Sequence, residues 1–316
     1  MVPMRCAVVD VGTNSVKLLV ADVLGRQVEP VLEEAQQTRL GDGMYRTGRL
    51  QAEAIARTSA AVAAFARLAR AQGAAAVRVF ATSAAREAVN AGELVAAIER
   101  TSGLRLEILS GSAEAEAAFR GVRTQPGMAG GALVLVEVGG GSTQLIVGGD
   151  ERVEFRGSFP VGALRFLEEH PIADPPQAGA LAAARVWLRE FLARQVRPAL
   201  EPVRARLAPS AAQPPRIVGV GGTATVLARM ERQMDDYDRP TIESVRLSRA
   251  RLGEWVDRLW AEPLSRRRQI VGLPPERADV ILPGAAIYEA VLAELGLEPL
   301  CFSTRGLRFA MAATCA

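Results

Sequence analysis

Histidine and lysine are almost absent from this chain. Its 316 residues include one histidine, His170, and one lysine, Lys17, whereas the other 37 of its 38 basic residues are arginine. A single histidine excludes a metal centre made of several imidazoles, and a Ser-His-Asp triad could use only His170. A GC-rich genome is enough to explain the arginine excess, so the excess by itself predicts no site.

Cysteine is also scarce, and long apolar runs are missing. Cys6, Cys301 and Cys315 are odd in number, widely spaced and outside any CxxC motif, which is typical of reduced, mostly buried thiols in a cytoplasmic protein. No run reaches 18 apolar residues, which excludes a membrane-spanning helix. Residues 1–5 lead directly into a predicted strand without the regions of a signal peptide. We therefore expect a cytoplasmic protein with no membrane partner.

The charges are nearly balanced, with 38 basic and 35 acidic residues and a formal net charge of +3. This balance argues against a protein dedicated to binding nucleic acid. Hydrophobic residues make up 49% of the chain and aromatic residues only 5%, so we expect a globular core of Ala, Val, Leu and Ile. A length of 316 residues predicts two domains or one large α/β unit.

The chain repeats one pattern of elements. Residues 6–10 and 16–23 are apolar runs separated by a short polar turn, which predicts a hairpin. The Gly-rich segment 125–131 is the best linker, and after it the pattern returns in a second predicted hairpin. We therefore predict an α/β protein with two similar domains facing each other across a cleft, spanning residues 1–126 and 127–304.

Further elements follow from periodicity and from breaks at Gly and Pro. We predict helices at 50–71, 83–90, 93–100, 113–122 and 177–207, the last one broken near Pro198 and Pro202. The remaining predicted strands are 28–38, 77–81, 106–109, 133–138, 144–148, Arg216–Val220 and 301–303.

Three turns of small residues stand at 12–15, 139–143 and 219–223. Such turns present backbone N–H groups without obstruction, which is how proteins hold phosphate oxygens. One such turn is usually only a turn, but three of them favour a phosphate-binding site. None matches GxxxxGK[ST], which excludes a P-loop NTPase. The third turn fits the dinucleotide pattern GxGxxA, but residues 229–239 are polar and supply no second strand ending in an acidic residue.

A carboxylate stands beside each of the first two turns. Asp10 ends the first predicted strand and Glu137 ends its counterpart in the second hairpin. Carboxylates in these positions predict a Mg²⁺ site, held directly or through water. The alternative is that each carboxylate only caps a turn.

Several stretches in this order resemble the exopolyphosphatase/guanosine pentaphosphate phosphohydrolase (Ppx/GppA) family of the actin-like ATPase superfamily. The stretches cover nearly the whole chain, and together they are highly specific. They are VVDVGTNSVKLLVAD (8–22), RLGDGMYRTGRL (39–50), ATSAAREAVN (81–90), LSGSAEAEAAFRGV (109–122), VEVGGGSTQLIVG (136–148), FPVGALRF (159–166), GVGGTATVLA (219–228), RADVILPGA (277–285) and STRGLR (303–308).

The resemblance implies hydrolysis of the terminal phosphate of inorganic polyphosphate, and often of guanosine pentaphosphate, with Mg²⁺ or another divalent cation. It places the catalytic glutamate at Glu114, where a carboxylate could deprotonate the attacking water. It places a phosphate-contacting arginine at Arg86. The substrate-binding residues that it implies are Thr13, Asn14, Ser15, Gly140, Gly141, Ser142, Thr143, Gly222 and Thr223.

The chain departs from the family pattern at two of the implied metal positions. The family usually has Asp and Glu where this chain has Glu137 and Gln144, while Asp10 is retained. An amide can accept a hydrogen bond but cannot neutralise a cation, so Gln144 predicts a weakened metal site. The chain also resembles the short family members that lack a helical extension. The resemblance implies that its two domains are actin-like (ribonuclease H-like) and that a C-terminal helix at residues 305–316 packs back on the first domain.

We therefore expect an exopolyphosphatase that uses metal-assisted attack by water. The alternative is a weakly active or inactive regulatory protein that binds polyphosphate or guanosine tetra- or pentaphosphate. A kinase or chaperone of the same superfamily fits less well, because those proteins generally carry larger inserted subdomains. The sequence leaves a homodimer open.

Overall fold

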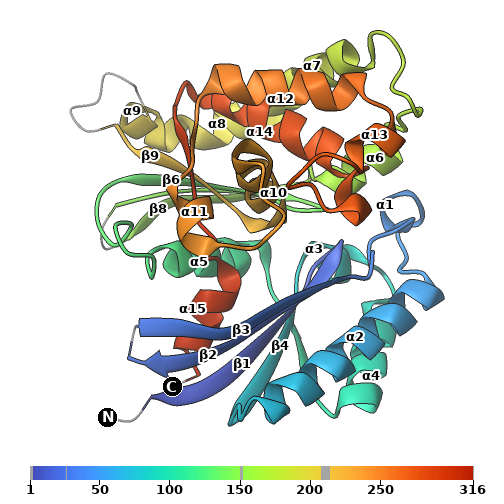
Figure 1. Ribbon diagram of the computed structural model, residues 1–316, viewed down its shortest axis with the longest axis vertical. Coiled ribbons are helices and arrows are strands. Elements are labelled where there is room, and N and C mark those ends of the chain that lie inside the picture. The colour runs from blue at the N-terminus through green and yellow to red at the C-terminus, as the bar shows by residue number, and fades with distance from the viewer. Residues whose placement is uncertain (1–2, 26, 150–151, 208–213, 316) are drawn as a thin grey trace. The chain divides into compact units, whose positions relative to one another are not determined.

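The computed structural model describes residues 3–25, 27–149, 152–207 and 214–315 (Figure 1). The chain forms two compact units. The first unit comprises Met1–Ala129 and Arg305–Ala316, and the second unit comprises Gly130–Thr304. The domain boundary predicted after residue 126 lies close to the boundary between these units, and the predicted ends at residues 1 and 316 lie outside the described residues.

The first unit contains a five-stranded sheet in the order β3-β2-β1-β4-β5. The first three strands are antiparallel, whereas β1, β4 and β5 are parallel. The strands are β1 (Met4–Val11), β2 (Ser15–Leu24), β3 (Gln27–Gln37), β4 (Ala76–Ala81) and β5 (Leu106–Ile108). The helices are α1 (Met44–Thr47), α2 (Ala52–Ala71), α3 (Ser83–Glu87), α4 (Ala91–Ser102), α5 (Gly111–Val122) and α15 (Leu307–Ala313).

The two faces of this sheet bury different helices because successive side chains along a strand point in opposite directions. Along β1, Ala7 and Val9 pack in a cluster with α2 and α4. Cys6 and Val8 pack on the other face with Phe309 of α15. Figure 1 shows α15, in red, beside the blue strands β1 to β3. Asp10 continues the series of Cys6 and Val8, so it lies on the face that α15 covers.

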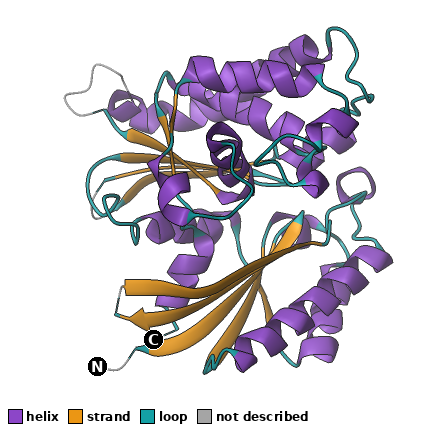
Figure 2. Ribbon diagram, in the orientation of Figure 1, coloured by secondary structure: helices purple, strands orange, loops and turns teal. Residues whose placement is uncertain are grey.

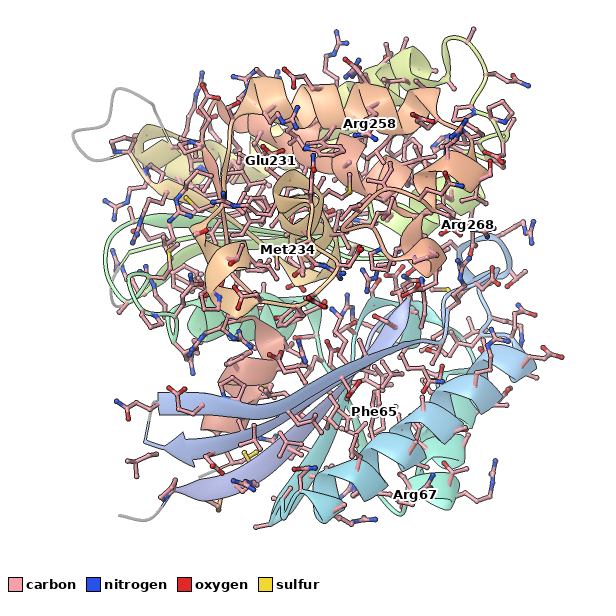
Figure 3. All side chains as sticks on the ribbon, viewed as in Figure 1. Phe65, Arg67, Glu231, Met234, Arg258 and Arg268 are labelled. Atoms are coloured by element: carbon pink, nitrogen blue, oxygen red, sulfur yellow. The ribbon has the colours of Figure 1, made fainter. Side chains whose placement is uncertain are left out.

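Helix α2 is amphipathic and packs its apolar side against the sheet. Phe65 is buried in the cluster on its face of the sheet, whereas Arg67 is exposed on the outer side of the helix (Figure 3).

The second unit contains a six-stranded sheet in the order β10-β11-β9-β6-β7-β8. Strands β6, β7 and β8 are antiparallel, and β6, β9 and β11 are parallel. The strands are β6 (Leu133–Val138), β7 (Thr143–Gly148), β8 (Val153–Phe159), β9 (Arg216–Val220), β10 (Arg246–Leu247) and β11 (Leu300–Phe302). One face of β6 to β9 packs in a large cluster with α7, α10, α12 and α14.

The helical part of the second unit is broken into many segments (Figure 2). The α-helices are α6 (Ala163–Glu169), α7 (Ala180–Phe191), α8 (Arg197–Leu200), α9 (Arg204–Leu207), α10 (Gly221–Arg232), α11 (Arg239–Ser244), α12 (Arg249–Ala261), α13 (Leu264–Arg267) and α14 (Ile281–Leu295). A π-helical segment η1 (Leu192–Val196) and the 3₁₀ segments η2 (Glu201–Val203) and η3 (Pro275–Arg277) complete it.

The two sheets share the topology of five strands, to which the second sheet adds β10. An antiparallel meander, β1-β2-β3 or β6-β7-β8, is followed on the other side of its first strand by parallel strands, β4-β5 or β9-β11. This is the actin-like arrangement, and it confirms the predicted α/β fold class. Among the described residues, no helix has both the length and the apolar character needed to cross a membrane.

Several predicted elements are corrected. The helix predicted at 83–90 ends at Glu87, because the Asn90 amide instead hydrogen-bonds the backbone N–H and C=O of Leu50. The helix predicted from residue 177 begins at Ala180, after Gly179 with φ of 85°. The breaks predicted near Pro198 and Pro202 are confirmed by α8 and η2. Strand β8 was not predicted, although its alternating burial is the two-residue period of a strand.

Candidate active site

The hairpin of the first unit places a carboxylate opposite the single lysine. Asp10 of β1 pairs directly with Lys17 of β2. Between them, loop one (residues 12–15) is closed by the Gly12 N–H, which donates to the Ser15 carbonyl oxygen at 3.0 Å. A Cβ on Gly12 would lie 3.1 Å from that oxygen, so a larger residue would press on this turn. The turn therefore favours glycine for space.

The carbonyl groups of loop one are held by a later segment of the same unit. The N–H groups of Thr38 and Arg39 donate to the Asn14 oxygen at 3.1 and 2.9 Å, and the Gly41 N–H donates to the Thr13 oxygen at 2.8 Å. Arg39 has a φ of 48°, an uncommon conformation for a residue other than glycine. Within the described part of the chain, the N–H groups of Thr13 and Asn14 donate to no backbone oxygen. These two amides are therefore available to a ligand.

Asp10 is poorly hydrated at one of its two oxygens. Its Oδ1 is inaccessible to solvent and has no hydrogen-bond partner among the described residues. Burial raises the pKa of the Asp10 carboxyl, while the positive charges of Lys17 and Arg308 act in the opposite direction. An uncompensated buried oxygen is costly unless something binds it, and a divalent cation is a suitable partner for this carboxylate.

The ends of three neighbouring strands bring the next two candidate residues to the same edge of the sheet. The end of β1 lies beside the end of β4, and β4 lies beside β5. Helix α3, which carries Arg86, follows β4, and α5, which carries Glu114, follows β5. In parallel sheets this carboxyl edge is where ligands bind.

Glu114 and Arg86 form an ion pair within the first unit. Arg86 Nη1 lies 2.9 Å from Glu114 Oε2 and also donates to the Leu109 carbonyl oxygen at 2.9 Å. Glu114 stands in the first turn of α5, where Ser110 caps the helix by accepting from the Ala113 N–H. The Glu114 residue is 8% exposed. Arg86 therefore fixes the direction of a nearly buried carboxylate.

The hairpin of the second unit repeats this backbone with other side chains. Glu137 of β6 pairs with Gln144 of β7, and the Gly139 N–H donates to the Ser142 oxygen at 2.9 Å. Gln144 is 1% exposed, and its Nε2 donates to the hydroxyl oxygens of Ser142 and Ser158 at 2.9 and 3.2 Å. A neutral amide held by two serines therefore stands where the first unit has Lys17.

Loop two (residues 139–143) is also held through its carbonyl groups. The N–H groups of Ala163 and Leu164 donate to the Gly139 and Gly140 oxygens at 2.9 and 2.8 Å, and Arg165 Nε donates to the Gly141 oxygen at 2.7 Å. Over the ranges that the structure describes, the N–H groups of Gly140 and Gly141 donate to no backbone oxygen. Loop two thus offers free amides, as loop one does.

The third turn (residues 219–223) lies beside Glu137 and starts helix α10. Gly221 has a φ of 82°, and a Cβ there would lie 2.9 Å from Glu137 Oε1. The Thr223 hydroxyl donates to the Val138 carbonyl oxygen at 3.0 Å, which ties the turn to the end of β6. Thr143 makes the equivalent tie in loop two by donating to the Val161 oxygen at 2.6 Å.

A cation that the sequence did not single out covers the third turn. A Cβ on Gly222 would lie 2.2 Å from Arg277 Nη1, so the guanidinium rests directly on this glycine. Burial lowers the pKa of Arg277, and among the described residues its guanidinium has no hydrogen-bond or ion-pair partner. Because arginine stays charged in proteins, this position favours an anionic ligand.

Tyr288 closes the base of the second hairpin. Its hydroxyl lies 2.9 Å from the Val136 oxygen and 3.0 Å from the Val220 oxygen, so it can donate to either one. Burial raises the pKa of Tyr288, and the negative charge of Glu137 raises it further. Tyr288 therefore stays neutral and supports the two strands that carry loop two and the third turn.

The structure thus assembles the predicted residues in two groups. The first unit holds Asp10, loop one, Arg86 and Glu114, and the second unit holds Glu137, loop two, Gln144 and the third turn. Lys17 and Arg277 are additional charged residues at these places. Lys17 carried one signal in the sequence, since it is the only lysine of an arginine-rich chain. Arg277 carried none apart from its position in a family stretch.

Neither group resembles a dense metal site. Among the described residues, no cluster of three or more His, Cys, Asp or Glu side chains could hold a metal ion. Mg²⁺ is commonly bound through one or two carboxylates together with water and substrate phosphates. The Oδ1 of Asp10, which has no hydrogen-bond partner among the described residues, fits that mode of binding.

The chain is similar to proteins of one known family. Residues 19–312 match the profile of the Ppx/GppA phosphatase family. The chain is 37% identical to exopolyphosphatase 2 of Mycobacterium tuberculosis over 312 residues, covering 95% of this chain and 94% of that protein. It is 31% identical to exopolyphosphatase 1 of Mycobacterium leprae, covering 96% and 87%.

Two solved structures share the fold. One is a crystal structure of an exopolyphosphatase-like protein, with a TM-score of 0.88 and 27% identity over 100% of this chain and 98% of that chain. The other is the Aquifex aeolicus PPX-GPPA enzyme, with a TM-score of 0.78 and 28% identity over 99% of both chains. The match to the family profile and the identity to its curated members lead to one conclusion: this chain belongs to the Ppx/GppA phosphatase family.

Proposed function

We propose that this protein is an exopolyphosphatase that releases the terminal phosphate of inorganic polyphosphate. The observation that carries the proposal is the Glu114–Arg86 pair at the carboxyl edge of the first sheet. A nearly buried carboxylate held by one cation has the fixed direction that a general base needs. The related exopolyphosphatases support polyphosphate as the substrate.

Glu114 acts on the nucleophile in this proposal. Its carboxylate accepts a proton from the attacking water, whose oxygen bonds to the terminal phosphorus while the bridging P–O bond breaks. The shortened chain leaves with its electrons on the former bridging oxygen. Arg86 orients Glu114 and places positive charge near the transferred phosphoryl group, where charge develops in the transition state.

The backbone loops bind phosphate oxygens. The free N–H groups of Thr13 and Asn14 in loop one, and of Gly140 and Gly141 in loop two, donate to these oxygens. Ser15, Ser142, Thr143, Gly222 and Thr223 shape the same turns. Arg277 over the third turn supplies a cation for the polyanion.

Asp10 in the first unit would hold Mg²⁺ or another divalent cation, largely through water, and Glu137 is the matching cation-binding position of the second unit. When bound, the cation neutralises phosphate charge and polarises the reacting group. Gln144 adds no charge to this set, so we expect the second unit to contribute less to cation affinity than the first.

The test is phosphate release from polyphosphate in Mg²⁺ and in EDTA, with Glu114→Gln compared against wild type. We expect about 10²–10⁴-fold slower release in the variant, the usual contribution of a general base. Glu116→Gln is the matched control, since Glu116 lies in the same helix and pairs with Arg120 instead. Equal rates in the two variants would contradict the role of Glu114.

Two finer questions belong to the same assay. We propose guanosine pentaphosphate as a second substrate, measured by the loss of its 5′ terminal phosphate. The neutral Gln144 favours a second candidate function, a regulatory protein that binds these polyanions with little turnover. That function predicts that wild type binds polyphosphate yet releases phosphate no faster than Glu114→Gln.

A further inference from the structure

Two cysteines from different elements of the first unit meet at the end of helix α15. The carbonyl oxygen of Ala312 accepts a hydrogen bond from the Cys6 thiol at 3.6 Å and another from the Cys315 backbone N–H at 2.9 Å. Cys6 lies in the middle of the sheet on β1, and Cys315 follows α15. One carbonyl group therefore joins two thiol residues that are 309 positions apart.

The two thiols differ in exposure. Cys6 is completely buried, whereas Cys315 is partly exposed. Cys315 packs against the cluster that contains Cys6. A small oxidant in solution can therefore reach Cys315, and Cys6 stands behind it.

Arg78 supplies a positive charge at this place. Its Nη1 donates to the Thr314 hydroxyl at 2.9 Å, and its guanidinium lies 4.7 Å from the centre of the Phe80 ring. The neighbouring Cys6 thiol lowers the pKa of the Cys315 thiol, as does the charge of Arg78. The neighbouring Cys315 thiol, together with burial, raises the pKa of Cys6.

Peroxide oxidises a thiol pair most readily when one thiol has a lowered pKa and is accessible while the other lies beside it, and Cys315 and Cys6 differ in this way. The attacking sulfur must be a thiolate, and the resolving thiol must lie next to it. Cys301 in the second unit offers a contrast, because burial raises its pKa and no cysteine accompanies it in its unit.

We propose that Cys315 is a peroxide-sensitive thiol that forms a disulfide with Cys6. The Cys315 thiolate attacks one oxygen of hydrogen peroxide, giving the sulfenic acid and hydroxide as the O–O bond breaks. The Cys6 sulfur then attacks the Cys315 sulfur, an S–S bond forms, and the sulfenic oxygen leaves as water with the Cys6 proton. In sum, two thiols are oxidised and one peroxide is reduced to two waters.

The bond would fasten α15 to the central strand of the first sheet. It links the start of β1 to the segment after α15, so that α15 could no longer leave the sheet. A cross-link between distant residues stabilises a fold mainly by restricting the unfolded chain. We therefore expect the midpoint of thermal unfolding of the oxidised protein to rise.

Peptide mapping tests the bond directly in the full chain. Trypsin places the three cysteines on separate peptides, at residues 6–17, 278–305 and 309–316. After treatment with hydrogen peroxide, blocking of free thiols and digestion without reductant, we expect peptides 6–17 and 309–316 to be joined and 278–305 to carry the blocking group. Free thiols at both Cys6 and Cys315, or a dimer joined through Cys315 alone, would overturn the proposal.

Variants separate the roles of the two sulfurs. In Cys6→Ser, we expect Cys315 to accumulate as a sulfenic acid that dimedone traps, whereas Cys301→Ser should form the disulfide as wild type does. Arg78→Gln should slow alkylation of Cys315 at pH 7 and move its pH profile upward, and Arg78→Lys should restore much of the rate. Alkylation of Cys315 no faster than that of Cys301 in the folded protein would contradict the proposed activation.

Discussion

The hairpins of the two units have nearly the same backbone and very different side chains. Each turn is closed by a glycine N–H that donates to a serine oxygen three residues later, at 3.0 Å from Gly12 and 2.9 Å from Gly139. A Cβ on either glycine would lie 3.1 Å from that oxygen. The cross-strand pair beside the turn is Asp10 with Lys17 in the first unit and Glu137 with Gln144 in the second.

The two hairpins therefore share the backbone geometry that binds phosphate but differ in the charged side chains beside it. Both loops have their carbonyl groups held and their N–H groups free, so the repeated backbone serves equally in both units. The first unit adds a carboxylate held by a cation, Glu114 with Arg86, at the same edge of its sheet. We therefore expect changes in the first unit to affect turnover more than the matching changes in the second unit.

After Glu114→Gln, the largest effect should come from the carboxylates at the strand ends. We expect Asp10→Asn to lower kcat about 100-fold, because a lost charge at a phosphoryl-transfer site costs several kcal/mol. We expect Glu137→Gln to lower kcat only about tenfold, because the neutral Gln144 already makes the second unit the weaker metal position. Phosphate release at saturating Mg²⁺ measures both. A larger loss from Glu137→Gln would reverse the proposed division of labour.

Close backbone contacts should separate stability from binding. A Cβ on Gly121 of α5 would lie 1.9 Å from the Gly306 oxygen, and one on Gly162 would lie 2.6 Å from the Gly140 carbonyl group. We expect Gly121→Ala to reduce the free energy of unfolding by about 2–3 kcal/mol, as overpacking does. Gly162→Ala should mainly raise KM, because it would move loop two. Urea unfolding and steady-state kinetics measure the two effects.

The matched control for these glycines is Gly92→Ala in α4. Nothing lies within 4 Å of a Cβ at Gly92, so this variant should be slightly more stable than wild type. If Gly121→Ala behaved like Gly92→Ala, the close packing of α5 against the start of α15 would be wrong.

Replacement of Gln144 by Glu should make the second hairpin more dependent on a cation. The new carboxylate would stand directly opposite Glu137, and like charges in cross-strand pairs are destabilising. We expect a lower unfolding midpoint in EDTA, recovery in Mg²⁺, and a kcat about tenfold higher, the equivalent of about 1.4 kcal/mol. The same midpoint with and without Mg²⁺ would remove the second unit from the metal site.

The smallest effect should be a stability change at Asp10 that depends on pH. Burial raises the pKa of Asp10 in the folded protein, so the unfolded chain releases this proton at lower pH than the folded chain. Asp10 therefore costs stability increasingly as pH rises from the ordinary carboxyl range through the raised value. Without metal, Asp10→Asn should be more stable than wild type at pH 7.

The higher stability of Asp10→Asn should disappear below the ordinary pKa of Asp, near 3.8, because Asp10 is then protonated in both the folded and the unfolded chain. Urea unfolding of the two proteins across this range measures it. An advantage that grows as pH falls would mean that Asp10 is held as an ion in the folded protein, as a carboxylate paired with Lys17 would be.

Much of the fold could be predicted because it depends on local patterns of apolar, polar and turn residues. Apolar runs on either side of a short polar turn located both hairpins, and Pro198 and Pro202 located two breaks in the helical region. The Arg216–Val220 strand was predicted with its observed bounds. Strand β8 was missed because it lies at the edge of the sheet, where only every second residue is partly buried and the apolar signal is weak.

The candidate site was less predictable, because its contacts join distant parts of the chain. Glu114 and Arg86 were chosen from family stretches, and nothing in either stretch indicates that they pair with each other. Arg277 reaches Gly222 from a segment 55 residues later. Such contacts depend on which strands and helices become neighbours, which no local pattern records.

The sequence by itself determined the α/β class, the repeated hairpins with their glycine turns, and membership of a phosphatase family. These depend on periodicity, on residue size and on ordered motifs, all of which are local. Only the tertiary structure decided that Lys17 stands opposite Asp10, that Arg86 holds Glu114, and that Cys6 meets Cys315. The reason is physical: strand register and helix packing set the distances between charged and thiol groups, and both are fixed by the burial of the whole core.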